Sequence, residues 1–85
     1  MHTTIYGLIF RITPSHGYLE VPTSLTKYVG FEPSQFSVRM SGYWHLEEDC
    51  DAPQLLKLLD AHGVRYSVNE YHADEDYEQM LDLWR

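Results

Sequence analysis

The chain has 85 residues, of which 44% are hydrophobic and 14% aromatic, and it carries a formal net charge of −7. This length predicts a single domain over residues 1–85, and the hydrophobic content argues against global disorder. A lone cysteine, Cys50, excludes an internal disulfide, and no apolar run reaches the roughly 18–20 residues of a membrane-spanning helix. Because the first residues also lack the basic segment of a signal peptide, we expect a cytoplasmic protein without membrane contact.

The first half of the chain begins with a strand and a brief helix. Residues 4–13 are apolar at both odd and even positions, a pattern typical of a central strand covered on both faces. Residues 18–21 are predicted to extend this strand as a short hairpin arm beyond a Pro-Ser-His-Gly turn. A brief helix is predicted from residues 22–24 to Gly30, because glycine readily adopts the left-handed conformation that ends helices.

Two further strands, at residues 36–40 and 43–46, are predicted to form a hairpin. A connecting loop of two residues would bring Arg39 and Trp44 to the same face of the sheet. A loop of three residues instead places Trp44 on the helix side and Arg39 beside His45 on the other side. We predict the longer loop, because it keeps the apolar side chains of the hairpin together.

The second half of the chain is predicted to contain two helices. Asp51 is placed to accept hydrogen bonds from the first-turn amides of a helix that ends at Gly63. Residues 64–69 alternate as a strand, and Asp74 then caps a C-terminal helix. The predicted apolar faces contain Leu55 and Leu59 in the first helix, and Tyr77, Met80, Leu81 and Trp84 in the second.

The order of these elements is β-α-β-β-α-β with an extra C-terminal helix. It predicts an α+β fold of the ferredoxin-like, split βαβ type, whose sheet is antiparallel. The first and third strands should be central, and the first two helices should cover one face. The predicted core consists of the inward-facing residues of both layers, namely Leu8, Phe10, Val38, Trp44, Leu55, Leu59, Tyr66 and Val68.

The negative charge is concentrated in the second half, since residues 1–46 sum to +1 and residues 47–85 to −8. Such a surface repels phosphates, which argues against nucleic-acid and membrane partners, and it complements a basic protein surface. The residues predicted to contact such a partner are acids and two aromatics, namely Glu47, Glu48, Asp49, Tyr71, Asp74, Glu75, Asp76, Glu78 and Trp84. In the alternative interpretation, the acidity only keeps the chain soluble.

A second candidate surface is the sheet face opposite the two predicted helices. The polar residues assigned to it are Arg11, Arg39, His45 and Arg65, which lie beside Ile5 and Ile9. RNA-binding domains of this fold stack bases on aromatic residues of this face, and the two isoleucines provide no such ring. We expect the C-terminal helix, or a second copy of the chain, to cover the isoleucines, and a homodimer stays open.

No sequence motif points to catalysis. The five histidines lack the spacing of metal ligands, and the carboxylates around Cys50 oppose formation of a thiolate. The sequence has neither a Gly-x-Ser-x-Gly nucleophile motif nor a glycine loop that binds phosphate. We therefore expect no catalytic residue, no metal and no cofactor.

The predicted function is that of a small, acidic, non-enzymatic module that binds a protein partner. An inhibitor of a basic, nucleic-acid-binding protein fits this composition, and its size and charge are comparable with those of anti-CRISPR, anti-restriction and antitoxin-type proteins. The alternative is a small regulatory or ligand-binding domain that dimerises through its sheet face.

Overall fold

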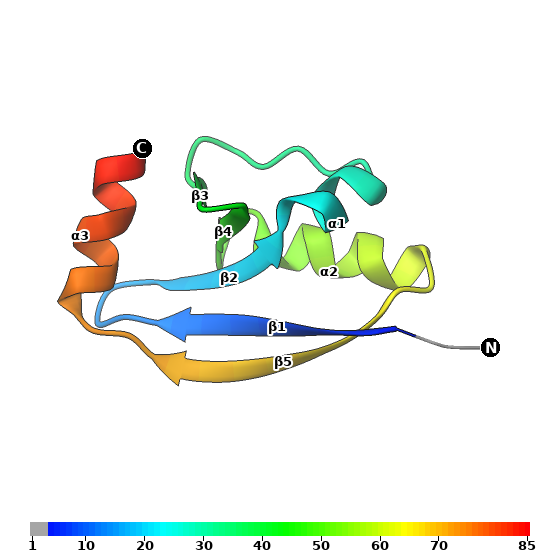
Figure 1. Cartoon of the computed structure of the whole chain (residues 1–85), viewed down its shortest axis with the longest axis horizontal. Helices are drawn as coiled ribbons and strands as arrows, with labels where there is room; N and C mark the ends of the chain where they lie inside the picture. The colour runs from blue at the N-terminus through cyan, green and yellow to red at the C-terminus, as the bar shows by residue number, and fades with distance from the viewer. Residues whose placement is uncertain (1–3) are drawn as a thin grey trace.

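The computed structural model describes residues 4–85, which form a five-stranded mixed sheet and three helices (Figure 1). The elements in chain order are β1 (Ile5–Ile12), β2 (Gly17–Pro22), α1 (Thr23–Tyr28), β3 (Val38–Met40), β4 (Tyr43–Glu47), α2 (Ala52–Ala61), β5 (Arg65–His72) and α3 (Glu75–Trp84). The strand order across the sheet is β3-β4-β2-β1-β5. No helix within the described residues is long and apolar enough to cross a membrane.

The α+β composition is confirmed, but the strand order differs from the ferredoxin-like prediction. β5 pairs in parallel with β1, so the sheet is mixed and not antiparallel. The segment predicted as a short arm is the full strand β2, which lies at the centre of the sheet between β1 and β4. The alternation of side chains along β2 explains its central position, because Leu19 and Val21 point to one covered face while Tyr18 and Glu20 point to the other.

The two faces of the sheet carry separate hydrophobic clusters. One cluster joins β1, β2 and β4 to α1 and α2, and its buried members are Leu8, Leu19, Val21, Leu25, Val29, Leu46, Ala52, Leu55 and Leu59. The other cluster joins the opposite face to α3 through Tyr18, Val38, Met40 and Leu81. Of the predicted core residues, Val38 therefore belongs to the α3 side, and Val68 is 40% exposed on the edge strand.

The predicted three-residue hairpin loop is wrong. Ser41 and Gly42 have φ angles of 53° and 82° and form a two-residue turn of the kind that matches strand twist. Arg39 consequently lies directly opposite Trp44, on the same face of the sheet. The prediction assumed that only one face of the hairpin was apolar, whereas α3 also buries Val38 and Met40 on the second face.

The helix boundaries agree with the sequence signals, but both predicted caps differ. Asp74 precedes α3 and makes no side-chain capping hydrogen bond. Gly63, with φ of 68°, follows α2, and the Val64 amide donates to the Leu59 carbonyl at 2.9 Å. The carboxylate of Asp51 makes no capping bond to α2. It instead accepts hydrogen bonds from the Ser34 amide at 2.9 Å, from the Ser34 hydroxyl at 2.8 Å and from the Ser37 hydroxyl. Asp51 therefore fixes the loop before β3.

Candidate functional site

Two acidic segments that are far apart in the sequence meet at one end of the sheet. β1, β4 and β5 run in the same direction, because β1 and β4 are both antiparallel to β2 and β5 is parallel to β1. The segments that follow β4 and β5, residues 48–51 and 73–84, therefore leave the sheet at the same end, which is marked by α3 in Figure 1. We call this end of the molecule the α3 end.

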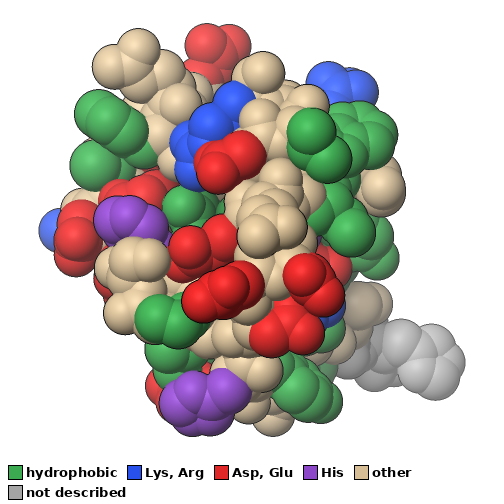
Figure 2. Space-filling model, turned by 90° about the vertical axis from the view of Figure 1, so that its left-hand side faces the viewer, with side chains coloured by type: hydrophobic (Ala, Val, Ile, Leu, Met, Phe, Trp, Pro, Cys, Tyr) green, Lys and Arg blue, Asp and Glu red, His purple; other side chains and the backbone are tan. Residues whose placement is uncertain are grey.

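Figure 2 shows the α3 end, where Asp and Glu side chains gather with histidine and hydrophobic side chains between them. Of the predicted contact residues, the exposed ones are Asp49, Tyr71, Asp74, Glu75, Asp76 and Trp84. Tyr71 is 56% exposed and Trp84 is 54% exposed. Tyr71 is the second-last residue of β5, and Trp84 is the last residue of α3. Neither aromatic ring belongs to the two hydrophobic clusters described above.

Three predicted contact residues are half-buried, and two of these have structural partners. Glu47 accepts hydrogen bonds from the amides of Asp49 and Cys50 at 2.9 and 2.8 Å, which forms the turn before α2. Glu78 accepts from the hydroxyls of Thr13 and Ser15, which ties α3 to the β1–β2 turn. The Thr13 hydrogen bond lowers the pKa of the Glu78 carboxyl below its ordinary value.

Glu48 is the third half-buried acid of the α3 end. One carboxylate oxygen each of Glu47, Glu48 and Asp49 lies within 4.8 Å of the others, and the hydrogen bonds of Glu47 account for its position in this turn. The pKa of the Cys50 thiol is raised, chiefly by its hydrogen bond to the Glu47 carboxylate. Partial burial and the charges of the neighbouring acids act in the same direction. This direction agrees with the sequence-based expectation that the carboxylates disfavour a thiolate.

Of the four residues predicted for the basic sheet face, Arg11, His45 and Arg65 lie on the face opposite α1 and α2, and Arg39 does not. Arg39 lies on the face of α1 and α2 because of the two-residue hairpin turn, so it is separated from Arg11 and His45. Arg11 is paired with Glu20 across 2.8 Å, and His45 is only 3% exposed. Sequence reasoning missed Glu20 because it treated β2 as a peripheral arm, although the alternation of residues 18–21 was the available signal.

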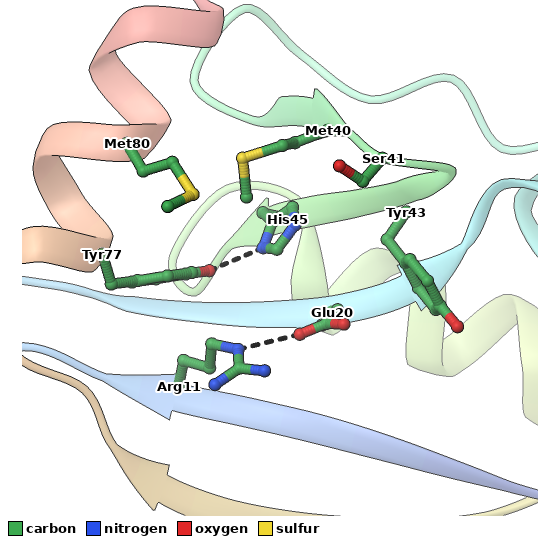
Figure 3. A pocket seen from close by; sticks show the side chains of 8 residues that line it. All are labelled: Arg11, Glu20, Met40, Ser41, Tyr43, His45, Tyr77 and Met80. Carbon is green, nitrogen blue, oxygen red and sulfur yellow. Dashed lines mark hydrogen bonds and ion pairs between the residues drawn. The ribbon is translucent and has the colours of Figure 1, made fainter.

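The face that carries Arg11 and His45 contains a pocket of about 310 Å³ between α3 and the β3–β4 hairpin (Figure 3). Its lining residues are Arg11, Glu20, Met40, Ser41, Tyr43, His45, Tyr77 and Met80. Nδ1 of His45 lies 2.6 Å from the Tyr77 hydroxyl, and the Arg11 guanidinium carbon lies 5.5 Å from the centre of the Tyr77 ring. The polar side chains thus form one connected network beneath α3.

Burial controls the protonation of this network. It lowers the pKa of the His45 imidazole, although the nearby Glu20 carboxylate acts in the opposite direction. It also raises the pKa of the Tyr77 hydroxyl far above its ordinary value. Both side chains are therefore neutral at neutral pH, and they join β4 to α3 by a neutral hydrogen bond. Tyr77 was predicted as part of an apolar helix face, so its polar partner was not foreseen.

Comparison of the chain with protein-family models, curated proteins and solved structures finds no match.

Proposed function

We propose that this chain is a non-enzymatic module that binds a protein partner with a basic surface through the α3 end. The observation that carries the proposal is the convergence of residues 48–51 and α3 at one end of the sheet. Four of the predicted acids there, Asp49, Asp74, Glu75 and Asp76, are exposed, as are the apolar side chains of Tyr71, Leu83 and Trp84. Aromatic anchors surrounded by charges of one sign are typical of protein contact surfaces.

An inhibitor of a nucleic-acid-binding protein is the form of this function that we favour. A cleft that binds nucleic acid is lined with Lys and Arg, which recognise phosphates. An acidic surface of comparable shape competes for the same side chains, and long-range attraction accelerates its association. The net charge of −7 and the acidic α3 end fit this type of competition.

The test is a pair of variants with the same net charge. Reversal of Glu75 and Asp76 to lysine changes the α3 end, whereas reversal of Glu32 and Asp60 to lysine changes acids outside it. The immobilised wild-type chain is used to capture its partner at low salt, and association rates of both variants with that partner are then measured. We expect the first variant to associate more slowly and the second to resemble wild type.

Two results would refute the proposal. Capture that persists unchanged at high salt would exclude an interface dominated by charge, because salt screens exposed charges. Equal slowing of association in both variants would mean that net charge matters and that the α3 end does not. Circular dichroism of both variants is the control for intact folding.

A second candidate function is a small regulatory or ligand-binding domain, and the pocket beneath α3 favours it. Its volume of about 310 Å³ is at the lower end of the roughly 300–1,000 Å³ typical of ligand sites. Apolar walls from Met40 and Met80 flank a polar floor, an arrangement that suits a small polar ligand. Chemical-shift changes centred on His45 and Tyr77 during titration with a metabolite mixture would support this function.

A further inference from the structure

The outer edge of β5 is a long strand edge without a partner in the described chain. β5 pairs with β1 over eight consecutive residues, from Ile5 with Arg65 to Ile12 with His72, without a bulge. Within residues 4–85, no backbone hydrogen bond joins Arg65–His72 to an element other than β1. Figure 1 shows β5 at the border of the sheet, with no helix or loop across its outer side.

This edge lacks most of the features by which monomeric proteins protect edge strands. Such strands are usually very short, bulged or covered, or they contain proline or charged residues, lysine above all, and Arg65 and Glu70 are the only charged residues of β5. β5 has eight residues and the sequence RYSVNEYH, which contains neither proline nor lysine. Every side chain of β5 except Tyr66 is exposed, including Val68 at 40%. The opposite edge of the sheet, β3, has only three residues.

We propose that β5 pairs in antiparallel fashion with β5 of a second copy of this chain, with the two-fold axis at Val68. Residues directly opposite each other in an antiparallel pair have their side chains on the same face of the sheet. Side chains alternate between the faces, and each residue lies on the same face in both copies, so odd-numbered residues must pair with odd-numbered ones and even with even. Of the permitted registers, those centred on Val68 and on Asn69 give the longest overlap within Arg65–His72, and the side chains decide between them.

The side chains of β5 are complementary in this register. Val68 lies opposite Val68 of the second copy, which buries two half-exposed apolar side chains against each other. Arg65 lies opposite Tyr71 of the second copy, where a guanidinium and an aromatic ring attract each other. A shift of the axis by one residue, to Asn69, would set Val68 against Glu70 and leave the valine beside a carboxylate.

The charge distribution favours the antiparallel arrangement over a parallel one. β5 itself is neutral, because Arg65 and Glu70 are its only Asp, Glu, Lys or Arg residues. The acidic α3 end follows the C-terminal end of β5. Antiparallel pairing therefore separates the two acidic ends by about the length of the strand, roughly 26 Å, which exceeds the Debye length of about 8 Å. Both α3 ends stay accessible in such a dimer.

Sedimentation velocity and light scattering over a concentration series test the dimer. We expect a mass that rises toward twice the 10.0 kDa of one chain, and a dimer that is strengthened by added salt because salt screens the net repulsion. Val68→Lys places two like charges at the axis and should give the monomer mass. Phe36→Lys changes an exposed residue before β3, at the other edge, and should remain dimeric.

Cysteine cross-linking tests the register, in a Cys50→Ser background that removes the free thiol. Val68→Cys places two thiols opposite each other, so oxidation should give a covalent dimer. Arg65→Cys is the matched control, because the two copies of residue 65 are about 20 Å apart in this register and should not cross-link.

A wild-type chain that is monomeric at every concentration would overturn the proposal, as would a dimer that Val68→Lys leaves intact. Equal cross-linking of the two cysteine variants would overturn the register. Protection of the β5 amides from hydrogen exchange only in complex with a different protein would assign the edge to that protein and not to a second copy. Tyr71 is the one residue shared with the contact surface proposed at the α3 end; the charge-reversal test of that surface uses Glu75 and Asp76, which lie outside β5, so the two proposals fail independently.

Discussion

Nδ1 of His45 and the hydroxyl of Tyr77 lie 2.6 Å apart, and this hydrogen bond joins β4 to α3 beside the apolar contact of Val38, Met40 and Leu81. Tyr77 also packs edge-on against Tyr18, with ring centres 6.0 Å apart, and its ring centre lies 5.5 Å from the Arg11 guanidinium carbon. One side chain of α3 thus contacts three strands of the sheet. The position of α3, and therefore of the acidic surface on it, depends on this residue.

Tyr77→Phe should lower the free energy of unfolding by about 1–3 kcal/mol, because it leaves the buried Nδ1 of His45 without a partner. Denaturant unfolding monitored by circular dichroism measures the change. Tyr43→Phe is the matched control, since Tyr43 lines the same pocket but its hydroxyl makes no hydrogen bond within residues 4–85. Equal stabilities of the two variants would contradict the assigned role of Tyr77.

Acid should destabilise the fold through His45. Burial lowers the pKa of this imidazole below its ordinary value of 6.5, so the unfolded chain binds a proton at a pH at which the folded chain does not. The free energy of unfolding should therefore be insensitive to this group well above pH 6.5 and should fall as the pH drops below 6.5. In His45→Asn this part of the pH dependence should vanish, whereas the exposed His16→Asn should keep the wild-type slope.

The two longer helices were predictable because their signals are local. Leu55 and Leu59 lie one turn apart on the buried face of α2, and glycine at position 63 ends the helix in a left-handed conformation. Leu81 of α3 is likewise buried as predicted. In contrast, the apolar spacing in α3 did not reveal that Met80 stays about half exposed.

The sheet order and the site could not be predicted from local patterns. Arg11 and Glu20 meet because β1 and β2 are neighbours, a pairing that residue periodicity does not specify. Arg39 was misplaced because the longer loop was chosen to keep the apolar side chains of the hairpin on one face, whereas tertiary packing covers both faces. The role of Asp51 was mispredicted as a helix cap. Its hydrogen-bond partners, Ser34 and Ser37, lie in a loop 17 and 14 residues earlier in the chain, where a local pattern does not reveal them.

Leu55→Ala should cost about 2–5 kcal/mol of the free energy of unfolding, because Leu55 is fully buried between α2 and the sheet. Thermal and denaturant unfolding measure the loss. Leu83→Ala, at a position that is 84% exposed on α3, should change stability by no more than about 0.5 kcal/mol. A similar small effect at Leu55 would mean that the α2 face is misassigned.

Asp51→Ala should release the loop before β3 and cost about 1–3 kcal/mol, because the Ser34 amide and the Ser34 and Ser37 hydroxyls lose their acceptor. Hydrogen exchange at the Ser34 amide should accelerate. Asp51→Asn keeps one carbonyl oxygen as acceptor and should give a smaller change in both measurements. An unaltered exchange rate in the alanine variant would show that other contacts hold the loop.

Variants of Glu78 and Glu75 distinguish an effect on folding from an effect on binding. Both residues lie in the first turn of α3, but only Glu78 accepts hydrogen bonds from the β1–β2 turn. Each substitution to glutamine removes one carboxylate near the positive end of the helix dipole, so that contribution is similar in both variants. The difference in stability between Glu78→Gln and Glu75→Gln therefore reports the hydrogen bonds from Thr13 and Ser15. We expect Glu78→Gln to be less stable.

The pH dependence gives an independent check of the same pair. The folded-state pKa of Glu78 is lowered from its ordinary value of 4.5, so its stabilising contribution is present above pH 4.5 and is lost as the pH falls through the lowered pKa. Glu78→Gln should lack this acid-dependent loss, and Glu75→Gln should retain it. Equal stability and equal acid dependence of the two variants would show that the Thr13 and Ser15 contacts do not hold α3 in place.

In the binding assay Glu75→Gln should have the larger effect of the two variants. It should slow association with the partner while the fold remains intact, because Glu75 is exposed and makes no side-chain hydrogen bond within residues 4–85.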